Sequence, residues 1–445
     1  MPIASWSSKV RLGLIATVVA VGLYGIRPAY LYVSKKPTLD QSECLGRWGT
    51  ASDEDPSSKP RPTSGAVKVV RLNDLGEFVD RCEFTDVILE IGWDRFKDMR
   101  KGIFPMVTLV DPNQLSLPKF VVLYIHGWRH DGDDEDPDLT KFKELIKRLS
   151  ESNRNIRQVT GIYLAWPGKG SVPPLEMLSF WGRMRTADRI AQSAIVTKII
   201  GAVDSVLSAS GDVPEIGPNT EQVSGPFHDL PRRGNLFVAI GHSLGARMLF
   251  SATAQSLIYG IQSSHPGMPG GTYKTINGPT DAVILLNPAF EASLYTALNA
   301  IHRRDESFPR SQLPILLSVS TSNDLVTQYA FSSAQWLAWW TAPREIKTLG
   351  NYEEFKTHSL LPSDEDKCGT GLGVMTERYF AEGLCLYREG PAGVSFSPLI
   401  VARTSPDVIN GHSGIWDGPF PKWLFRFVDD LGKQTAMRKT ANRPK

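Results

Sequence analysis

The sequence predicts an α/β fold with a mostly parallel central sheet and helices on both faces. Between Phe120 and Asp429, apolar strand-like runs alternate with stretches of helical periodicity, which is typical of a parallel sheet with crossover helices. Several of these runs are apolar without a break, as strands covered on both faces are. Of the 445 residues, 41% are hydrophobic and 22% are charged, so the composition is that of a globular protein and not of a disordered one.

The expected elements follow one another in a regular order. The first buried strand covers Phe120–Ile125, and helical spacing follows over Lys141–Ser150. Before them, Asp86–Ile91 has the composition of an added antiparallel strand. We expect further strands at Thr160–Trp166, Leu236–Ile240, Ala282–Leu286, Pro314–Val319 and Leu399–Ala402, and further helices at Arg183–Leu207, Leu244–Leu257 and Pro421–Leu431. Because open parallel sheets carry their active sites beyond the carboxyl ends of the strands, the residues after each run are the candidates for function.

The first 65 residues differ in composition from the rest. Residues 1–36 contain an uncharged run at Leu12–Ile26, and we expect an uncleaved signal anchor there, which makes the protein a single-pass membrane protein. The alternative is a cleaved signal and a secreted or periplasmic protein. Basic residues flank the run on both sides, so the orientation stays open. Residues 37–65 form a Pro- and Ser-rich linker, and residues 66–445 form the folded domain, with insertions near 208–235, 262–280 and 351–393.

Charge and motifs exclude several classes of protein. Lys and Arg number 49 against 47 Asp and Glu, which leaves a formal net charge of +2 and argues against nucleic-acid binding through a large basic surface. There is no Walker loop, no GxGxxG fingerprint and no CxxC pair. The acidic loop from His130 to Asp136 lacks the spacing of an EF-hand, and we expect it to be a solvated loop. The sequence therefore predicts neither a metal nor an organic cofactor.

Four cysteines allow three pairings into two disulfides. The sequence does not decide which pairing forms, or whether all four are free thiols. A local disulfide is plausible outside the cytoplasm for the last two, which bracket one Gly-rich stretch. The four are Cys44, Cys82, Cys368 and Cys385.

The strongest motif follows the run Leu236–Ile240 directly. Residues 241–245 read GHSLG and stand between a strand and a helix, which is the setting of a G-x-S-x-G nucleophile elbow. In such a turn the serine adopts a strained conformation that leaves no room for neighbouring side chains, so glycines flank it. We expect the hydroxyl of Ser243 to stand exposed above the sheet, at a helix N-terminus that stabilises developing negative charge.

With His126-Gly127-Trp128 upstream, this elbow resembles the α/β-hydrolase superfamily, and its GHSLG sequence is similar to that of lipases and carboxylesterases. Residues 120–431 also resemble a group of little-characterised bacterial hydrolases. These combine an HG strand end, a W-P-[GS] strand end, here Trp166-Pro167-Gly168, and an H-S-[LM]-G elbow. The resemblance implies an α/β-hydrolase fold and a serine nucleophile; the first 65 residues or so have no counterpart in it.

A serine nucleophile needs a histidine base within hydrogen-bond reach. In this fold the chain order is nucleophile, acid, histidine, so the base must follow Ser243. His412 comes after the last expected strand and before the closing helix, where a loop base belongs. We therefore expect His412 to be the base, ahead of His358, which lies in an insertion.

The acid must orient the imidazole and stabilise its charged form. Asp324 follows the fifth buried strand, at the usual acid position of the fold. Some lipases instead place the acid one strand earlier, in a D-P-A sequence, but this chain has Asn287-Pro288-Ala289 there. We therefore expect Asp324 to be the acid, with Glu291 as runner-up and Asp407 as a weaker alternative.

The oxyanion formed by serine attack on an ester needs hydrogen-bond donors already in place. One is expected to be the backbone N–H of Leu244, and the other that of Trp128, which Gly127 allows to face the pocket. His126 is expected to be a structural hydrogen-bonder. Downstream, Trp336, Trp339 and Trp340 share one helix face, which indicates core packing or, alternatively, an apolar pocket wall or lid.

These residues together predict a membrane-anchored or exported serine hydrolase of the lipase or esterase kind, acting on an ester or lipid with an apolar portion. Two aromatic residues at strand ends, Trp128 and Trp166, favour such a substrate, and Phe180 and Trp181 before the long helix add to them. The alternatives are a peptidase, thioesterase or acyltransferase on the same triad, or a non-catalytic module that kept the fold.

Overall fold

The computed structural model describes Cys44 and residues 64–99, 117–170, 176–209, 234–268, 271–302, 307–330, 343–369, 375–389 and 397–441. The expected anchor at residues 1–36 lies outside these ranges, as does the linker up to residue 63 except for Cys44. Residues 210–233 of the first expected insertion also lie outside them.

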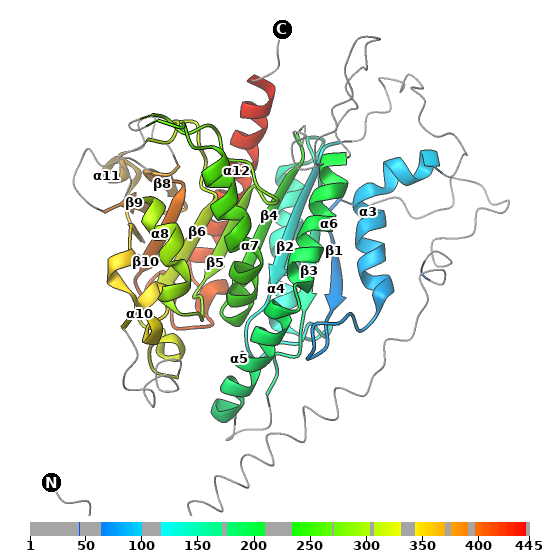
Figure 1. Ribbon diagram of the computed structural model, residues 1–445, viewed down its shortest axis with the longest axis horizontal. Coiled ribbons are helices and arrows are strands. Elements are labelled where there is room, and N and C mark those ends of the chain that lie inside the picture. Colours follow the sequence, from blue (N-terminus) through cyan, green and yellow to red (C-terminus); the bar gives the residue numbers. More distant parts are fainter. Residues whose placement is uncertain are drawn as a thin grey trace, which may run out of the picture.

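The described residues form a ten-stranded sheet in the order β1-β3-β2-β4-β5-β6-β10-β7-β9-β8 (Figure 1). Neighbouring strands from β1 to β7 in this order are parallel, whereas β9 and β8 are antiparallel additions at one edge. The mostly parallel sheet is thereby confirmed. The strands are β1 (Ala66–Arg71), β2 (Lys119–Ile125), β3 (Gln158–Ala165), β4 (Leu236–His242), β5 (Ala282–Leu286), β6 (Leu316–Thr321), β7 (His358–Pro362), β8 (Arg378–Ala381), β9 (Leu384–Arg388) and β10 (Leu399–Thr404).

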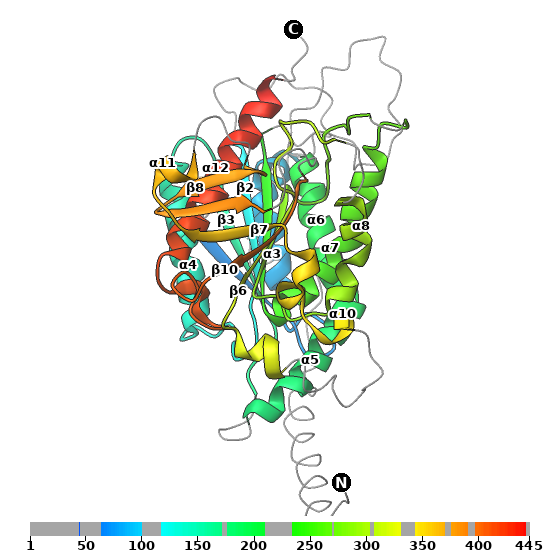
Figure 2. The same ribbon diagram turned by 90° about the vertical axis from the view of Figure 1, so that its left-hand side faces the viewer.

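Helices cover both faces of this sheet, as the alternation predicts. Those on one face include α3, α5, α6, α7 and α8, and those on the other include α4 and α12, so that the sheet lies between them in Figure 2. The α-helices are α3 (Arg81–Met99), α4 (Pro137–Ser152), α5 (Glu176–Gln192), α6 (Ile195–Ala209), α7 (Leu244–Ser263), α8 (Thr296–His302), α10 (Pro343–Ile346), α11 (Glu365–Cys368) and α12 (Phe420–Ala441). The short helical turns are η4 (Ala292–Tyr295), η5 (Val326–Ala330), η6 (Leu349–Asn351), η7 (Glu353–Phe355) and η8 (Gly414–Trp416).

Strand β2 shows why the central runs are apolar without a break. Its alternate residues Val121, Leu123 and Ile125 pack into the core under α5, α6 and α7, while Phe120, Val122 and Tyr124 pack into the core under α4 and α12. Successive side chains of a strand point to opposite faces. With a core on each face, both sets must be apolar.

The expectation of an antiparallel strand at Asp86–Ile91 is wrong, because these residues belong to α3. Phe84, Val87, Ile88 and Ile91 pack against the core at i, i+3, i+4 and i+7, the spacing of a helix face. A short apolar run fits a helix and a strand equally well by periodicity. The added strand is instead β1, which pairs with β3 in parallel.

The single helical stretch expected at Arg183–Leu207 is two helices, α5 and α6, which meet at an angle of 47°. The break contains Ala194, whose φ of 58° is incompatible with a continuing right-handed helix. Among the described helices, none is by itself long and apolar enough to cross a bilayer; this bent pair meets the criteria of length and composition only.

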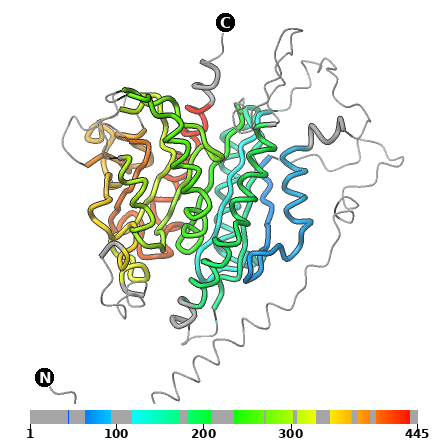
Figure 3. Tube along the Cα trace, viewed as in Figure 1, coloured from blue at the N-terminus to red at the C-terminus, as the bar shows by residue number. Residues whose placement is uncertain are grey.

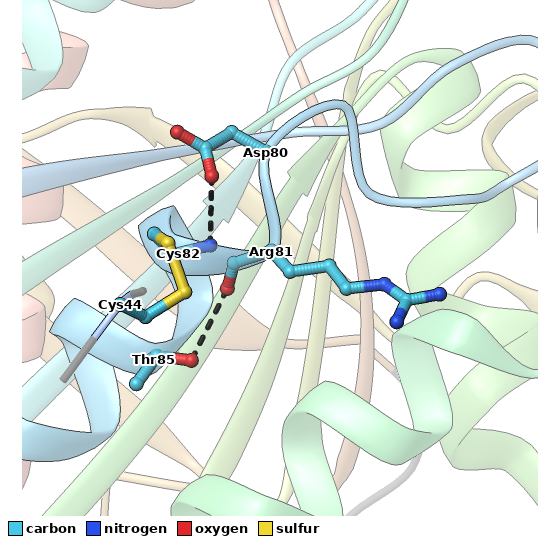
Figure 4. Close-up of a disulfide and its surroundings, with 5 residues drawn as sticks. All are labelled: Cys44, Asp80, Arg81, Cys82 and Thr85. Carbon is cyan, nitrogen blue, oxygen red and sulfur yellow. Dashed lines mark hydrogen bonds between the residues drawn. A yellow bond between two sulfur atoms is a disulfide. The ribbon is translucent and has the colours of Figure 1, made fainter. Parts of the chain in front are cut away.

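The described part of residues 351–393, expected as an insertion, contributes β7, β9 and β8 to one edge of the sheet and also contains the short helix α11. The colours of Figure 3 follow this layout, from the blue N-terminal elements at one end of the sheet to the orange strands at the other. A disulfide between Cys368 and Cys385 joins α11 to β9. A second disulfide joins Cys44 to Cys82 in the first turn of α3, where the Asp80 carboxylate accepts from the Cys82 N–H (Figure 4).

Candidate active site

Ser243 stands at the turn between β4 and α7 in a strained conformation with positive φ, at φ 55° and ψ −118°. Both flanking glycines are needed by close contacts. A Cβ on Gly241 would lie 2.7 Å from Ala246 Cα, and one on Gly245 would lie 2.2 Å from the carbonyl oxygen of Ile125. The end of β2 therefore packs directly on the start of α7, as a strained elbow requires.

The hydroxyl of Ser243 is not exposed, contrary to expectation: the residue is 0% exposed. His412 covers it from one side, with Nε2 at 2.6 Å from Oγ. The loop after β2 also lies against the residue, since a Cβ on Gly127 would lie 2.9 Å from Ser243 Cβ. The serine backbone is held on both sides as well, because its N–H donates to Leu286 O and its carbonyl accepts from the N–H of Ala289.

A second hydrogen bond continues from the same imidazole to Asp324, since His412 Nδ1 lies 2.7 Å from Asp324 Oδ2. A carboxylate only accepts, so Nδ1 carries the proton and Nε2 accepts from the Ser243 hydroxyl. Asp324 is 1% exposed, and its other oxygen accepts from the N–H groups of Val326 and Thr327. Burial alone would raise the pKa of Asp324, but the charge and hydrogen bond of His412 hold it below the usual value.

The loop that carries His412 is bound by side chains at three successive residues. Asn323 donates through its amide to Asn410 Oδ1 and accepts from the N–H of Gly411. The carbonyl oxygen of His412 accepts from His242 Nε2 at 3.0 Å and from Asn287 Nδ2 at 2.8 Å. Sequence reasoning noted Asn287 only for its missing carboxylate. Asn287 directly follows the buried strand β5, and this position could have indicated that it belongs to the site.

The alternative acids and the alternative base lie elsewhere. The Glu291 carboxylate is paired with Arg247 on α7, at 2.7 Å, and Asp407 is exposed. His358 is buried in β7, where its ring nitrogens bond to Thr357 Oγ1 and to the carbonyl of Thr376. The structure thus brings together Ser243, His412 and Asp324.

Trp128 and Leu244, the residues expected to supply the oxyanion donors, belong to two segments that lie at Ser243. Neither backbone N–H donates to a backbone carbonyl of the described residues. Leu244 is the first residue of α7, and Trp128 follows Gly127 in the loop that touches the serine. The N-terminus of α7 adds its partial positive charge at the same place.

His126 fastens this loop to the end of β3, in the structural role expected. Its Nδ1 donates to the carbonyl of Gly127, its Nε2 accepts from the N–H of Trp166, and Trp166 Nε1 donates back to the carbonyl of His126. Burial lowers the pKa of His126 to about 4, so the ring is neutral near pH 7. The HG and WPG strand ends are therefore one hydrogen-bonded unit.

The aromatic residues at the strand ends are packed inside the protein instead of lining a rim. Trp166 is 1% exposed and stacks on His126, and Trp128 is 5% exposed with its ring against Phe180. The stripe of Trp336, Trp339 and Trp340 lies outside the described residues.

The acidic loop is solvated only in its middle. Asp133, Asp134 and Glu135 are exposed, but Asp136 is buried. Its carboxylate accepts from the N–H groups of Asp131, Gly132 and Asp138 and bonds to His130, because it caps α4 and folds the loop around itself. No group of three His, Cys, Asp or Glu side chains that could hold a metal occurs in the described ranges.

No family model matches the chain, and no curated protein does. Among solved structures it is similar to phospholipase PlaB from Legionella pneumophila in complex with thio-NAD, with 11% identity over 72% of this chain and 62% of that chain and a TM-score of 0.27. A further PlaB structure has 11% identity over 72% and 63%, with a TM-score of 0.28. TT1662 from Thermus thermophilus has 15% identity over 71% and 90%, with a TM-score of 0.28.

The chain thus spans less than two thirds of the length of PlaB. Likenesses as distant as these do not bear on its activity.

Proposed function

We propose that this protein is a serine hydrolase that cleaves carboxylic esters, with Ser243 as nucleophile, His412 as base and Asp324 as the orienting acid. The observation that carries the proposal is the continuous hydrogen-bond chain from Ser243 Oγ through both ring nitrogens of His412 to Asp324 Oδ2. This chain starts at a serine held with positive φ between a strand and a helix. Such a combination is the geometry of a Ser-His-Asp triad.

In the proposed reaction, His412 Nε2 takes the hydroxyl proton while Ser243 Oγ attacks the ester carbonyl carbon. The carbonyl oxygen becomes an oxyanion and accepts hydrogen bonds from the N–H groups of Trp128 and Leu244. Asp324 stabilises the imidazolium. Collapse of the tetrahedral intermediate breaks the carbon–oxygen bond, and His412 returns the proton to the leaving alcohol, which leaves Ser243 acylated.

Water then replaces the alcohol. His412 accepts one proton from the water as its oxygen attacks the acyl carbon, and returns that proton to Ser243 Oγ when the acid leaves. One ester and one water give one acid and one alcohol.

A fluorophosphonate probe and an ester panel test the proposal. We expect the probe to label wild type and Ser251→Ala, a control on the exposed face of α7, but not Ser243→Ala. We expect p-nitrophenyl esters to be hydrolysed faster than the matching anilide. Absence of labelling in wild type would favour a non-catalytic module. Labelling with inert esters but active amides, thioesters or acyl acceptors would favour a peptidase, thioesterase or acyltransferase.

We also propose that residues 1–36 anchor this domain to a membrane and that the domain folds in an oxidising compartment. All four cysteines are paired in the structure, and such disulfides persist outside the reducing cytoplasm. Alkylation of the protein in intact membranes, before and after reduction, tests this. Four thiols that react without reduction would contradict it.

A further inference from the structure

We infer that His242 and Asn287 are positioning residues for the base: together they clamp the main-chain carbonyl of His412 and so set its imidazole over Ser243. The inference rests on the proposed function. Both side chains donate to the same oxygen, His242 Nε2 at 3.0 Å and Asn287 Nδ2 at 2.8 Å. A carbonyl oxygen has two lone pairs, so the clamp uses both. The two residues are 2% and 1% exposed, and we call the pair the carbonyl clamp.

Among the described residues, neither the N–H nor the carbonyl of His412 bonds to another backbone group. Gly411, with φ 72°, precedes the histidine and Gly414 follows two residues later. A Cβ on Gly411 would have no atom within 4 Å, so steric packing does not fix this residue. Glycine gives a chain more conformational freedom than any other residue. The position of the imidazole therefore depends on bonds from outside the loop.

His242 serves this purpose at a cost. Because a carbonyl oxygen only accepts, Nε2 of His242 carries the proton, and burial lowers the pKa of this histidine to about 3, so the ring is neutral. Its Nδ1 is then a bare acceptor, buried and without a partner in the described part of the chain. An unpaired buried polar atom destabilises the folded state. Stability alone does not explain a histidine here, whereas its bond to the base does.

Asn287 connects the base to the nucleophile through one short segment. Its amide oxygen accepts from the N–H of Thr321, and its amide nitrogen donates to His412. The neighbouring Leu286 and Ala289 bond to the N–H and the carbonyl of Ser243. Residues 286–289 thus support Ser243 and His412 at the same time, and Asn287 does so with φ 42° in the left-handed region. A shift of one partner would carry the other with it.

The test compares variants that change the clamp and leave the three proposed triad residues in place. Asn287→Asp is nearly isosteric but replaces the donor to the carbonyl oxygens of Gly411 and His412 by an acceptor. Asn287→Ala, which removes the donor, is the second variant in case the aspartate variant does not fold. His242→Leu removes the second donor, and His242→Gln restores an N–H at similar reach. The control is His358→Leu, which removes an equally buried histidine from β7.

With p-nitrophenyl butyrate, we expect kcat per fluorophosphonate-titrated site to fall about 10- to 100-fold in Asn287→Asp and His242→Leu, because a misplaced base costs rate and not substrate binding. KM should stay at its wild-type value, His242→Gln should recover most of kcat, and His358→Leu should keep it. In a His412→Ala background the clamp variants should cause no further loss, because the clamp then has no base to position.

Two results overturn the inference alone. One is wild-type kcat in the clamp variants while Ser243→Ala is inactive and His412→Ala keeps only residual activity; the other is an additive further loss in that residual activity when a clamp variant is combined with His412→Ala. Full activity in Ser243→Ala would overturn the proposed function and the clamp together.

Discussion

The Nε2 atom of His412 lies 2.6 Å from the hydroxyl oxygen of Ser243, although 169 residues separate the two along the chain. The sheet order explains the meeting. Ser243 follows β4, Asp324 follows β6 and His412 follows β10, and these strands lie in one parallel set with β5 between β4 and β6. Parallel strands end at a common edge, so residues from distant parts of the sequence converge there.

The acid assignment predicts opposite results for two carboxylate variants. Asp324→Asn should lower kcat by about 10⁴-fold, as loss of the orienting acid does in a serine triad, because the amide no longer stabilises the required tautomer of His412. Glu291→Gln should keep kcat close to wild type, since Glu291 bonds to Arg247, which retains Asp188 as a second partner. Steady-state kinetics on one ester decides. Equal losses in both variants would contradict the assignment.

The close approach of β2 and α7 predicts that Gly245→Ala is destabilising. The added Cβ would lie 2.2 Å and 2.5 Å from the carbonyl oxygens of Ile125 and His126, which are backbone atoms that cannot turn away. We expect a loss of at least about 1–3 kcal/mol in the free energy of unfolding, the usual cost of overpacking. Gly201→Ala, in α6 with open space around it, should instead gain about 0.5–1 kcal/mol. Urea unfolding of both variants is the measurement; equal midpoints would refute the contact.

Burial of His242 predicts a pH-dependent contribution to stability. Its pKa is about 3 in the folded protein and about 6.5 in an unfolded chain. Between these values the unfolded chain binds more protons, so stability falls as pH falls through this window, by about 1.4 kcal/mol per pH unit for this group. Above pH 6.5 both states are neutral and the contribution is complete.

Subtraction isolates this contribution from those of other groups. We subtract the free energy of unfolding of His242→Gln from that of wild type. The contributions of groups that titrate in both proteins then cancel, including that of Asp138, whose pKa is raised by burial. The difference should decrease steadily from pH 6 to pH 4. A difference that stays constant over that range would show that His242 titrates normally and is not buried.

The two disulfides predict separate losses of stability. By loop-closure entropy, a crosslink over 38 residues contributes about 4 kcal/mol and one over 17 residues about 3 kcal/mol. We expect lower melting temperatures for Cys44→Ser/Cys82→Ser and for Cys368→Ser/Cys385→Ser, with kcat unchanged because neither pair contacts the triad residues. Calorimetry and ester hydrolysis check both. Unchanged melting of a double variant would contradict a formed disulfide at that pair.

Local sequence patterns predicted those elements whose structure is set by interactions between residues close together in the chain. Unbroken apolar runs identified the central strands because both faces of the sheet are covered, and the glycines around Ser243 indicated an elbow because only their small size permits the turn. The run at Asp86–Ile91 was misassigned for the same reason: six residues do not distinguish a strand from one face of a helix.

The sequence by itself determined the parallel sheet, the elbow and the chain order of the candidate serine, acid and histidine. Only the tertiary structure decided which cysteines pair and that Ser243 is buried. It also decided that Glu291 pairs with Arg247, whereas Asp324 bonds to His412. The hydrogen bond from Asn287 to the carbonyl of His412 is a third such contact. The physical reason is range. Periodicity and turn sterics act over a few residues, whereas these contacts join segments that only the order of the strands brings side by side.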